Sequence, residues 1–174
     1  MATDSPKLNE QELINGKHYG AYHVQNPITG YKKIICKQKT MGFSDLFLKY
    51  VQKIDEKPEF DAIAQLEIPK NAIIIRPLVG RYDLGPDTDY TYISTKLRTD
   101  RVLIKKIEAV YSDDALRYDM KKCECYSDHN NKYKYHVGKE QKPKKDFDNN
   151  VFKECTSGIH FYLEKARASE YFFD

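Results

Sequence analysis

Apolar and polar residues alternate along much of the chain with a period of two, which is typical of β-strands that bury one face. Four such runs predict a central sheet, and they span residues 31–37, 62–68, 102–110 and 159–163. A further run at 19–24 is separated from 31–37 by Asn26-Pro27 and Gly30, so we expect these two runs to form a hairpin. In the third run Lys105-Lys106 interrupts the alternation, which predicts a β-bulge.

Helical spacing is confined to a few segments. Apolar side chains recur at i, i+3, i+4, i+7, i+8 and i+11 across residues 43–54, and Ser44 can cap the start of this helix. Short helices are also expected at 113–120 and 164–173. Because strands dominate and do not alternate regularly with helices, the order predicts an α+β fold with a mainly antiparallel or mixed sheet.

The domain organisation follows from where the apolar runs begin. Residues 1–16 are mostly polar and are expected to form an extended arm, and residues 17–174 are expected to form one globular domain. An arm that is ordered against a neighbouring chain would favour a protein that works inside an assembly. The arm carries no apolar stretch typical of a secretory signal, and no run of about 18 apolar residues predicts a membrane span.

Composition excludes several classes of protein. The chain has 174 residues, 14 Tyr and 8 Phe, and this aromatic content argues against a disordered chain. The net charge of +3 is too small to indicate a dedicated nucleic-acid-binding domain. Two lysine-rich segments are nevertheless candidates for contact with a polyanion, through Lys32, Lys33, Lys142, Lys144 and Lys145. The alternative interpretation is that they are solvated surfaces.

The four cysteines predict reduced thiols, with no disulfide and no bound metal. Cys123 and Cys125 are two residues apart, which is a poorer zinc ligand spacing than two to four intervening residues. We expect Cys36 and Cys155 to be buried, as free cysteines usually are. The sequence also has no phosphate-binding glycine loop, dinucleotide fingerprint or nucleophile motif, so no cofactor and no catalytic residue is predicted.

The segment before the last predicted strand stands out. A glycine turn leads directly into an apolar strand, and a histidine lies between two large apolar residues. The residues of this C-terminal motif are Cys155, Gly158, Ile159, His160, Phe161, Tyr162, Ala166 and Tyr171. We expect an architectural clasp, in which Gly158 is in close contact with a neighbour and His160 faces away from the core to help fix the last helix. The alternative is that His160 faces a ligand pocket.

The motif resembles the C-terminal C-x-x-G-I-H-F-F signature of an uncharacterised domain family of large DNA viruses, which is also found at the ends of pentapeptide-repeat proteins. Shorter likenesses lie at Gly30-Tyr31-Lys32-Lys33 and at residues 66–72 and 98–103. The resemblance implies a non-enzymatic, virus-encoded protein in the virion or the host cytoplasm. Such a protein would act through contacts with other viral proteins, for example as a minor capsid or virion-associated component.

A second likeness belongs to a different class of protein. The stretch Gly158-Ile159-His160-Phe161-Tyr162 is similar to the turn, strand and helix of the poly-ADP-ribosyltransferase fold. His160 stands where that family has tyrosine, so the likeness implies a nucleotide-binding or degenerate ADP-ribosyltransferase-like module. A third hypothesis is nucleic-acid binding through the lysine clusters, with an affinity that falls steeply with salt.

Overall fold

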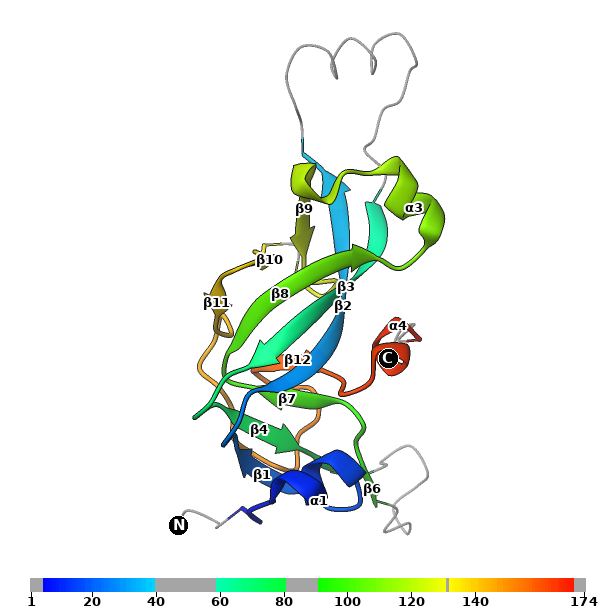
Figure 1. The fold of residues 1–174 in the computed structure, drawn as a ribbon. Coiled ribbons are helices and arrows are strands. Elements are labelled where there is room, and N and C mark those ends of the chain that lie inside the picture. Colours follow the sequence, from blue (N-terminus) through cyan, green and yellow to red (C-terminus); the bar gives the residue numbers. More distant parts are fainter. Residues whose placement is uncertain (1–4, 40–58, 81–90, 131, 171–174) are drawn as a thin grey trace, which may run out of the picture.

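Two antiparallel sheets meet near the middle of the molecule and form a single α+β domain (Figure 1). The computed structural model describes residues 5–39, 59–80, 91–130 and 132–170. The larger sheet has six strands in the order β10-β9-β2-β3-β8-β11, and the smaller has four in the order β1-β4-β7-β12. The predicted fold class is therefore confirmed.

The six-stranded sheet is built around three long strands that the alternation predicted. Its members are β2 (Ile28–Gln38), β3 (Glu59–Ile68), β8 (Val102–Ala109), β9 (Cys123–Tyr126), β10 (Lys134–Tyr135) and β11 (Glu140–Gln141). β2 and β3 stay in register over ten residue pairs. Between β3 and β8, Gln65 pairs with Lys106 while Leu66 pairs with Ile104, so Lys105 is the extra residue of the predicted bulge.

The four-stranded sheet corrects two expectations. It consists of β1 (Gly20–His23), β4 (Ile73–Arg76), β7 (Leu97–Thr99) and β12 (Ile159–Phe161), and a separate pair is formed by β5 (Leu78–Gly80) and β6 (Thr91–Ile93). The predicted hairpin between residues 19–24 and 31–37 is wrong, because β1 pairs with β4, while β2 pairs with β3 along its length and with β9 at residues 35–38. The expectation that 159–163 joins the central sheet is also wrong, because β12 pairs with β7.

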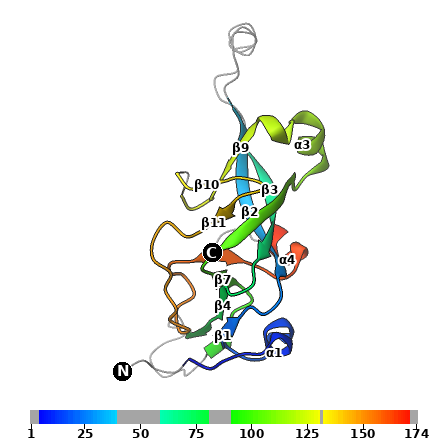
Figure 2. The ribbon, with the colours of Figure 1, turned by 60° about the vertical axis from the view of Figure 1, so that its left-hand side comes forward.

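A short bridge joins the two sheets. Tyr31 of β2 and Tyr162, which follows β12, exchange two backbone N–H···O hydrogen bonds of 2.8 Å. Next to this bridge a Cβ on Gly30 would lie 2.5 Å from Cδ2 of Phe161, so glycine is needed for the close approach. Figure 1 shows β12 between the larger sheet and β7, and Figure 2 shows the chain after β11 on the side opposite α4 (Lys165–Ser169).

The remaining helices are short. α1 (Glu10–Asn15) begins at a capping box between Asn9 and Glu12, and α3 (Ser112–Arg117) and a 3-10 turn (Met120–Lys122) follow β8. The segment expected to be an extended arm therefore contains a helix, and its Leu13 is fully buried. The predicted helix at 43–54 lies outside the described residues. No helix in the described part of the chain is long and apolar enough to cross a membrane.

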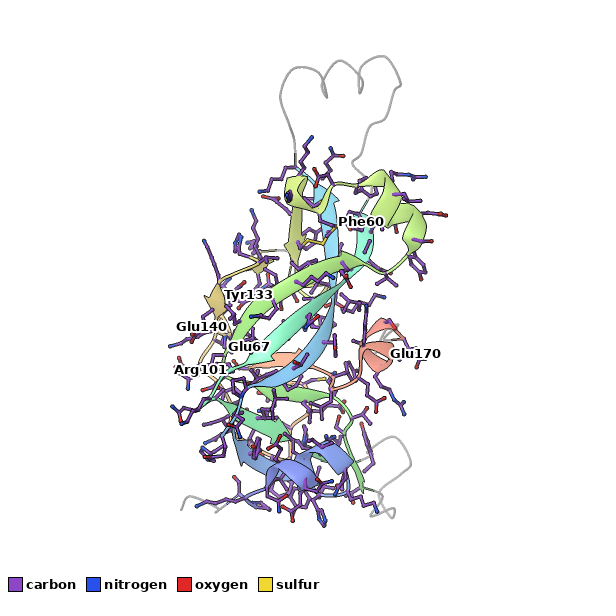
Figure 3. All side chains as sticks on the ribbon, in the orientation of Figure 1. Phe60, Glu67, Arg101, Tyr133, Glu140 and Glu170 are labelled. Carbon is purple, nitrogen blue, oxygen red and sulfur yellow. A yellow bond between two sulfur atoms is a disulfide. The ribbon has the colours of Figure 1, made fainter. Side chains whose placement is uncertain are left out.

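The core continues across both sheets through alternate strand positions. Ile34, Leu66, Ile104 and Phe161 have no exposed surface, and their burial supplies the main stabilising free energy. Phe60, which Figure 3 shows at the far end of the larger sheet, stacks on Tyr118 with ring centroids 4.6 Å apart.

The cysteines differ from the expectation. Cys36 of β2 and Cys125 of β9 are directly opposite each other in the antiparallel register and form a disulfide, so the prediction of four reduced thiols is wrong. The sequence hid this pairing because 89 residues separate the two cysteines. Cys36 is buried as predicted, whereas Cys155 is exposed and free.

Candidate functional site

A cavity of about 760 Å³ lies where the two sheets meet, and we call it the junction cavity. Its lining comes from β2, from the connection between β9 and β10, from residues 143–145 and from the loop that leads into β12. Among the described residues that line it, five are lysines and one, Asp128, is a carboxylate. The lysines are Lys32, Lys33, Lys96, Lys144 and Lys145.

Lys32 is a cation at a core-facing position. On β2 the even-numbered residues Gly30, Ile34 and Cys36 are buried, and strand alternation places Lys32 on the same face. Its ammonium group donates a hydrogen bond of 3.1 Å to the carbonyl oxygen of His160. Burial lowers the pKa of Lys32 to about 8, although the charge of Asp128 acts in the opposite direction. Lys32 is therefore still mainly a cation at pH 7.

Lys96, which is buried, and Glu154, which is half-buried, form a second polar group beside the cavity. Lys96 is 8% exposed, and its ammonium lies 3.8 Å from Oε1 of Glu154 and 3.8 Å from Sγ of Cys155. The Glu154 carboxylate also accepts hydrogen bonds from the hydroxyls of Tyr92 and Ser94, at 2.8 and 3.2 Å. These contacts fix the start of the loop that leads into β12.

Arg98 of β7 holds the same loop in place through hydrogen bonds to its backbone. Its guanidinium is fully buried and donates hydrogen bonds to the carbonyl oxygens of Asp148, Asn150 and Lys153. Burial lowers the pKa of Arg98 to about 10, and the nearby Asp148 carboxylate partly offsets this effect. A Cβ on Gly158 would lie 3.1 Å from Cβ of Arg98, which is the close approach that the sequence predicted.

His160 lies close enough to these cations for their charges to act on its ring. Its Nε2 is 3.0 Å from the carbonyl oxygen of Glu154, in a half-buried environment. Burial and the charges of Lys32, Lys96 and Arg98 lower the pKa of His160 to about 3, despite the hydrogen bond to Glu154. The imidazole is therefore neutral at physiological pH.

Another part of the lining of the junction cavity is polar and aromatic. Ser127, Asp128 and Asn130 line it from the turn after β9, together with Tyr133 and Tyr135, whose ring centroids are 5.1 Å apart. The hydroxyl of Tyr133 donates a hydrogen bond to the carbonyl oxygen of Lys142, which ties the 142–145 segment to this part of the lining. Burial raises the pKa of both tyrosines, so their hydroxyls stay protonated at neutral pH.

The junction cavity brings together most of the residues that the sequence singled out as two separate sets. From the C-terminal motif, Cys155, Gly158, Ile159, His160 and Tyr162 line it. From the lysine clusters, Lys32, Lys33, Lys144 and Lys145 line it, although the ammonium of Lys33 pairs with Asp61 at 3.3 Å.

Four of the residues that the sequence singled out either do not line the junction cavity or lie outside the described residues. Phe161 is in the core, and Lys142 is exposed and contributes only its backbone to the contact with Tyr133. His160 was expected to fix the last helix through Ala166 and Tyr171, but Ala166 is exposed, and Ala168 is the buried residue of α4. Tyr171 lies outside the described residues.

Sequence reasoning did not identify Lys96, Arg98 and Glu154 as site residues. β7 is three residues long, and a polar run around Leu97 gives no periodic signal of a buried strand. For Lys32 the sequence did contain a signal of a site residue, because this lysine interrupts the apolar face of its strand. The other members of that face are Ile28, Gly30, Ile34 and Cys36. In the part of the chain that the structure describes, no group of three His, Cys, Asp or Glu side chains could hold a metal ion.

Comparison with known proteins gives the family. Residues 17–168 match a family of unknown function, DUF5758. The chain is similar to the uncharacterized protein L223 of Acanthamoeba polyphaga mimivirus, with 28% identity over 87% of this chain and 88% of the relative. It is also similar to the uncharacterized protein L227 of the same virus, with 22% identity over 96% of this chain and 91% of the relative. No solved structure matches the chain. The chain therefore belongs to DUF5758, an uncharacterised protein family with members in a large DNA virus.

Proposed function

We propose that this viral-family protein is a binding protein whose ligand is a phosphate-bearing small molecule held in the junction cavity. The observation that carries the proposal is the charge of the lining, which among the described residues has five lysines and one carboxylate. Lys33 and Lys96 pair with carboxylates beside the cavity, and the other three lysines supply the remaining positive charge. Lysine ammonium groups bind phosphate as strong point-charge donors. Such an excess of cations in a concave site favours an anion.

The placement of Lys32 supports the same function. A lysine on the core-facing side of a strand costs free energy, because burial removes water from its ammonium group. Perturbed groups of this kind gather at functional sites, where a ligand of opposite charge offsets the cost. In the free protein the charge of Lys32 declines above a pH of about 8, so anion affinity is expected to fall there.

The cavity also fits a ligand larger than phosphate alone. A volume of about 760 Å³ is within the range of roughly 300–1,000 Å³ that is common for small-molecule sites. The rings of Tyr133 and Tyr135 offer apolar surface in the same lining. A nucleotide therefore belongs to the proposed class of ligands, so this proposal covers the nucleotide-binding hypothesis as well.

Calorimetric titration of the purified protein with a nucleoside monophosphate and with ribose 5-phosphate tests this function. We expect binding that weakens with added salt, and an affinity at least about ten-fold lower in Lys32→Met, since a buried charge-assisted contact contributes about 1.5–3 kcal/mol. Lys105→Met is the matched control, because it removes the same charge from an exposed side chain that pairs with Glu67. Equal affinities in both variants, or no binding of either phosphate, would contradict the proposal.

A virion role through protein–protein contacts is a second candidate, and one surface favours it. Leu116 of α3 is 88% exposed, and Tyr111, the N-cap residue of that helix, is 51% exposed, so α3 presents large apolar side chains to solvent. On this hypothesis the protein is a minor capsid or virion-associated component with other viral proteins as partners. Mass spectrometry of purified particles should find it at a fixed stoichiometry that Leu116→Glu abolishes. Its absence from wild-type particles would contradict this role.

A further inference from the structure

The hydrogen bonding of His160 defines which ring nitrogen carries the proton. Nε2 lies 3.0 Å from the carbonyl oxygen of Glu154, and a carbonyl oxygen only accepts hydrogen bonds. The Nε2 atom of the neutral ring must therefore carry the hydrogen, and Nδ1 must carry the lone pair. Among the described residues, none provides a hydrogen-bond donor to Nδ1.

This free acceptor lies beside a cation. The ammonium of Lys32 is bonded to the backbone oxygen of His160 itself, at 3.1 Å, and both residues line the junction cavity. Burial, together with the positive charges of Lys32, Lys96 and Arg98, lowers the pKa of the ring and keeps it neutral. A cation and an uncharged acceptor are thus presented together at one place in the lining.

An acceptor with a lone pair and a neighbouring ammonium select for different parts of one ligand. The ammonium attracts a phosphate oxygen, whereas the lone pair of Nδ1 repels an anion and requires a donor. The phosphate group of a dianionic ester has no hydrogen to donate, so by itself it satisfies only the first of these contacts. A phosphate ester that carries a hydroxyl close to the phosphate satisfies both.

We infer that the ligand is a phosphorylated polyol or sugar, with its phosphate on Lys32 and a neighbouring hydroxyl donating to Nδ1 of His160. This inference rests on the proposed function and specifies it, because it adds a donor requirement to the anion requirement. Free sugar phosphates and the ribose phosphate of a nucleotide share this chemistry. His160 is then a specificity-determining residue, and Lys32 supplies the affinity that all phosphates share.

A matched ligand series tests the inference on the wild-type protein. Calorimetry would compare glycerol 3-phosphate, ribose 5-phosphate and adenosine monophosphate with propyl phosphate, which has the same phosphate ester and no hydroxyl. We expect the hydroxylated ligands to bind about five- to ten-fold more tightly than propyl phosphate, as one neutral hydrogen bond allows. A further preference for adenosine monophosphate over ribose 5-phosphate identifies a nucleotide, and the reverse preference identifies a free sugar phosphate.

Variants separate the two contacts. His160→Phe should remove the preference for hydroxylated ligands, His160→Gln should restore part of it through its amide oxygen, and Lys32→Met should weaken all phosphates by a similar factor. Nitrogen NMR of the histidine rings tests the contact on the wild-type protein, so this measurement does not depend on whether a variant folds. The Nδ1 resonance of His160 should shift with glycerol 3-phosphate and stay unchanged with propyl phosphate.

The outcomes distinguish this inference from the proposed function. If no phosphate binds the wild-type protein, the proposed function fails and the inference fails with it. If all four organic phosphates bind with the same affinity, or if the Nδ1 resonance is unmoved by the hydroxylated ligands, only the inference is overturned. Persistence of the hydroxyl preference in a folded His160→Phe variant would overturn it as well.

Discussion

The two sheets of this protein are stabilised by different chemistry. In the six-stranded sheet, β2 and β3 pair over ten residues and bury apolar side chains such as Ile34 and Leu66. In the four-stranded sheet the strands are three or four residues long, and the buried side chains include Arg76 and Arg98, which are 4% and 0% exposed. The first sheet depends mainly on hydrophobic burial, and the second adds to hydrophobic burial the buried cations that are bonded to backbone carbonyls.

The difference explains why the cavity lies between the sheets. The long sheet provides a rigid strand that presents Lys32, while the short sheet uses Arg98 to hold the loop of residues 148–153, which leads to His160. A binding site needs both a fixed scaffold and a loop whose backbone is held in one conformation. If this division is correct, substitutions in the two sheets should have different consequences.

The largest effect is expected for Arg98→Met. The variant removes the donors to the carbonyl oxygens of Asp148, Asn150 and Lys153, and it should lower the free energy of unfolding by about 3–5 kcal/mol. Urea denaturation measures the loss. Arg117→Met on the exposed surface of α3 is the control and should change stability by less than about 0.5 kcal/mol. A loss below about 1 kcal/mol for Arg98→Met would show that the buried cation does not stabilise the smaller sheet.

The next largest effect concerns the bridge between β2 and β9. Replacing both Cys36 and Cys125 by alanine should lower stability by about 2–4 kcal/mol, because the disulfide restricts the unfolded chain across 89 residues. Thermal melts of the wild-type protein with and without reductant should differ in the same direction. Cys155→Ala is the control, because this thiol is exposed and free. Alkylation of all four cysteines without prior reduction would contradict the bridge.

A smaller effect is expected at the contact between the two sheets. In Gly30→Ala the new methyl group would lie 2.5 Å from the ring of Phe161 and 3.1 Å from Cδ1 of Ile68, so the sheets must shift apart. Overpacking of this kind costs about 1–3 kcal/mol. Thr29→Ala, at the neighbouring exposed position of β2, should cost much less. Similar melting temperatures for the two variants would show that the junction tolerates movement.

The smallest effect at neutral pH is expected for His160→Asn, which should lose about 1 kcal/mol with the hydrogen bond to Glu154. The effect of the substitution on stability changes at acidic pH, because the pKa of His160 in the folded protein is about 3, below its ordinary value of 6.5. Between these values the unfolded chain binds a proton that the folded protein does not, so stability should fall as the pH drops from about 6.5 to about 3. The variant should show a shallower fall in this window. Identical pH profiles would mean that His160 titrates normally.

Particular residues show how far the sequence predicts this structure. The alternation located β2, β3 and β8, and the break at Lys105-Lys106 located the bulge. The same reasoning failed for β7, because three buried residues that include Arg98 and Thr99 have no hydrophobic period. The sequence also separated the residues of the C-terminal motif from the lysines, which the structure brings into one cavity.

The sequence by itself determined which residues face the core along the long strands, because side-chain alternation is a local property of an extended backbone. Only the tertiary structure decided that β1 pairs with β4, that Cys36 meets Cys125, and that Lys32 lies beside His160. These contacts join segments that are far apart in the chain, and they depend on which strand edges the other strands leave open. Periodicity carries information about one strand and its burial, but none about its partner across the sheet.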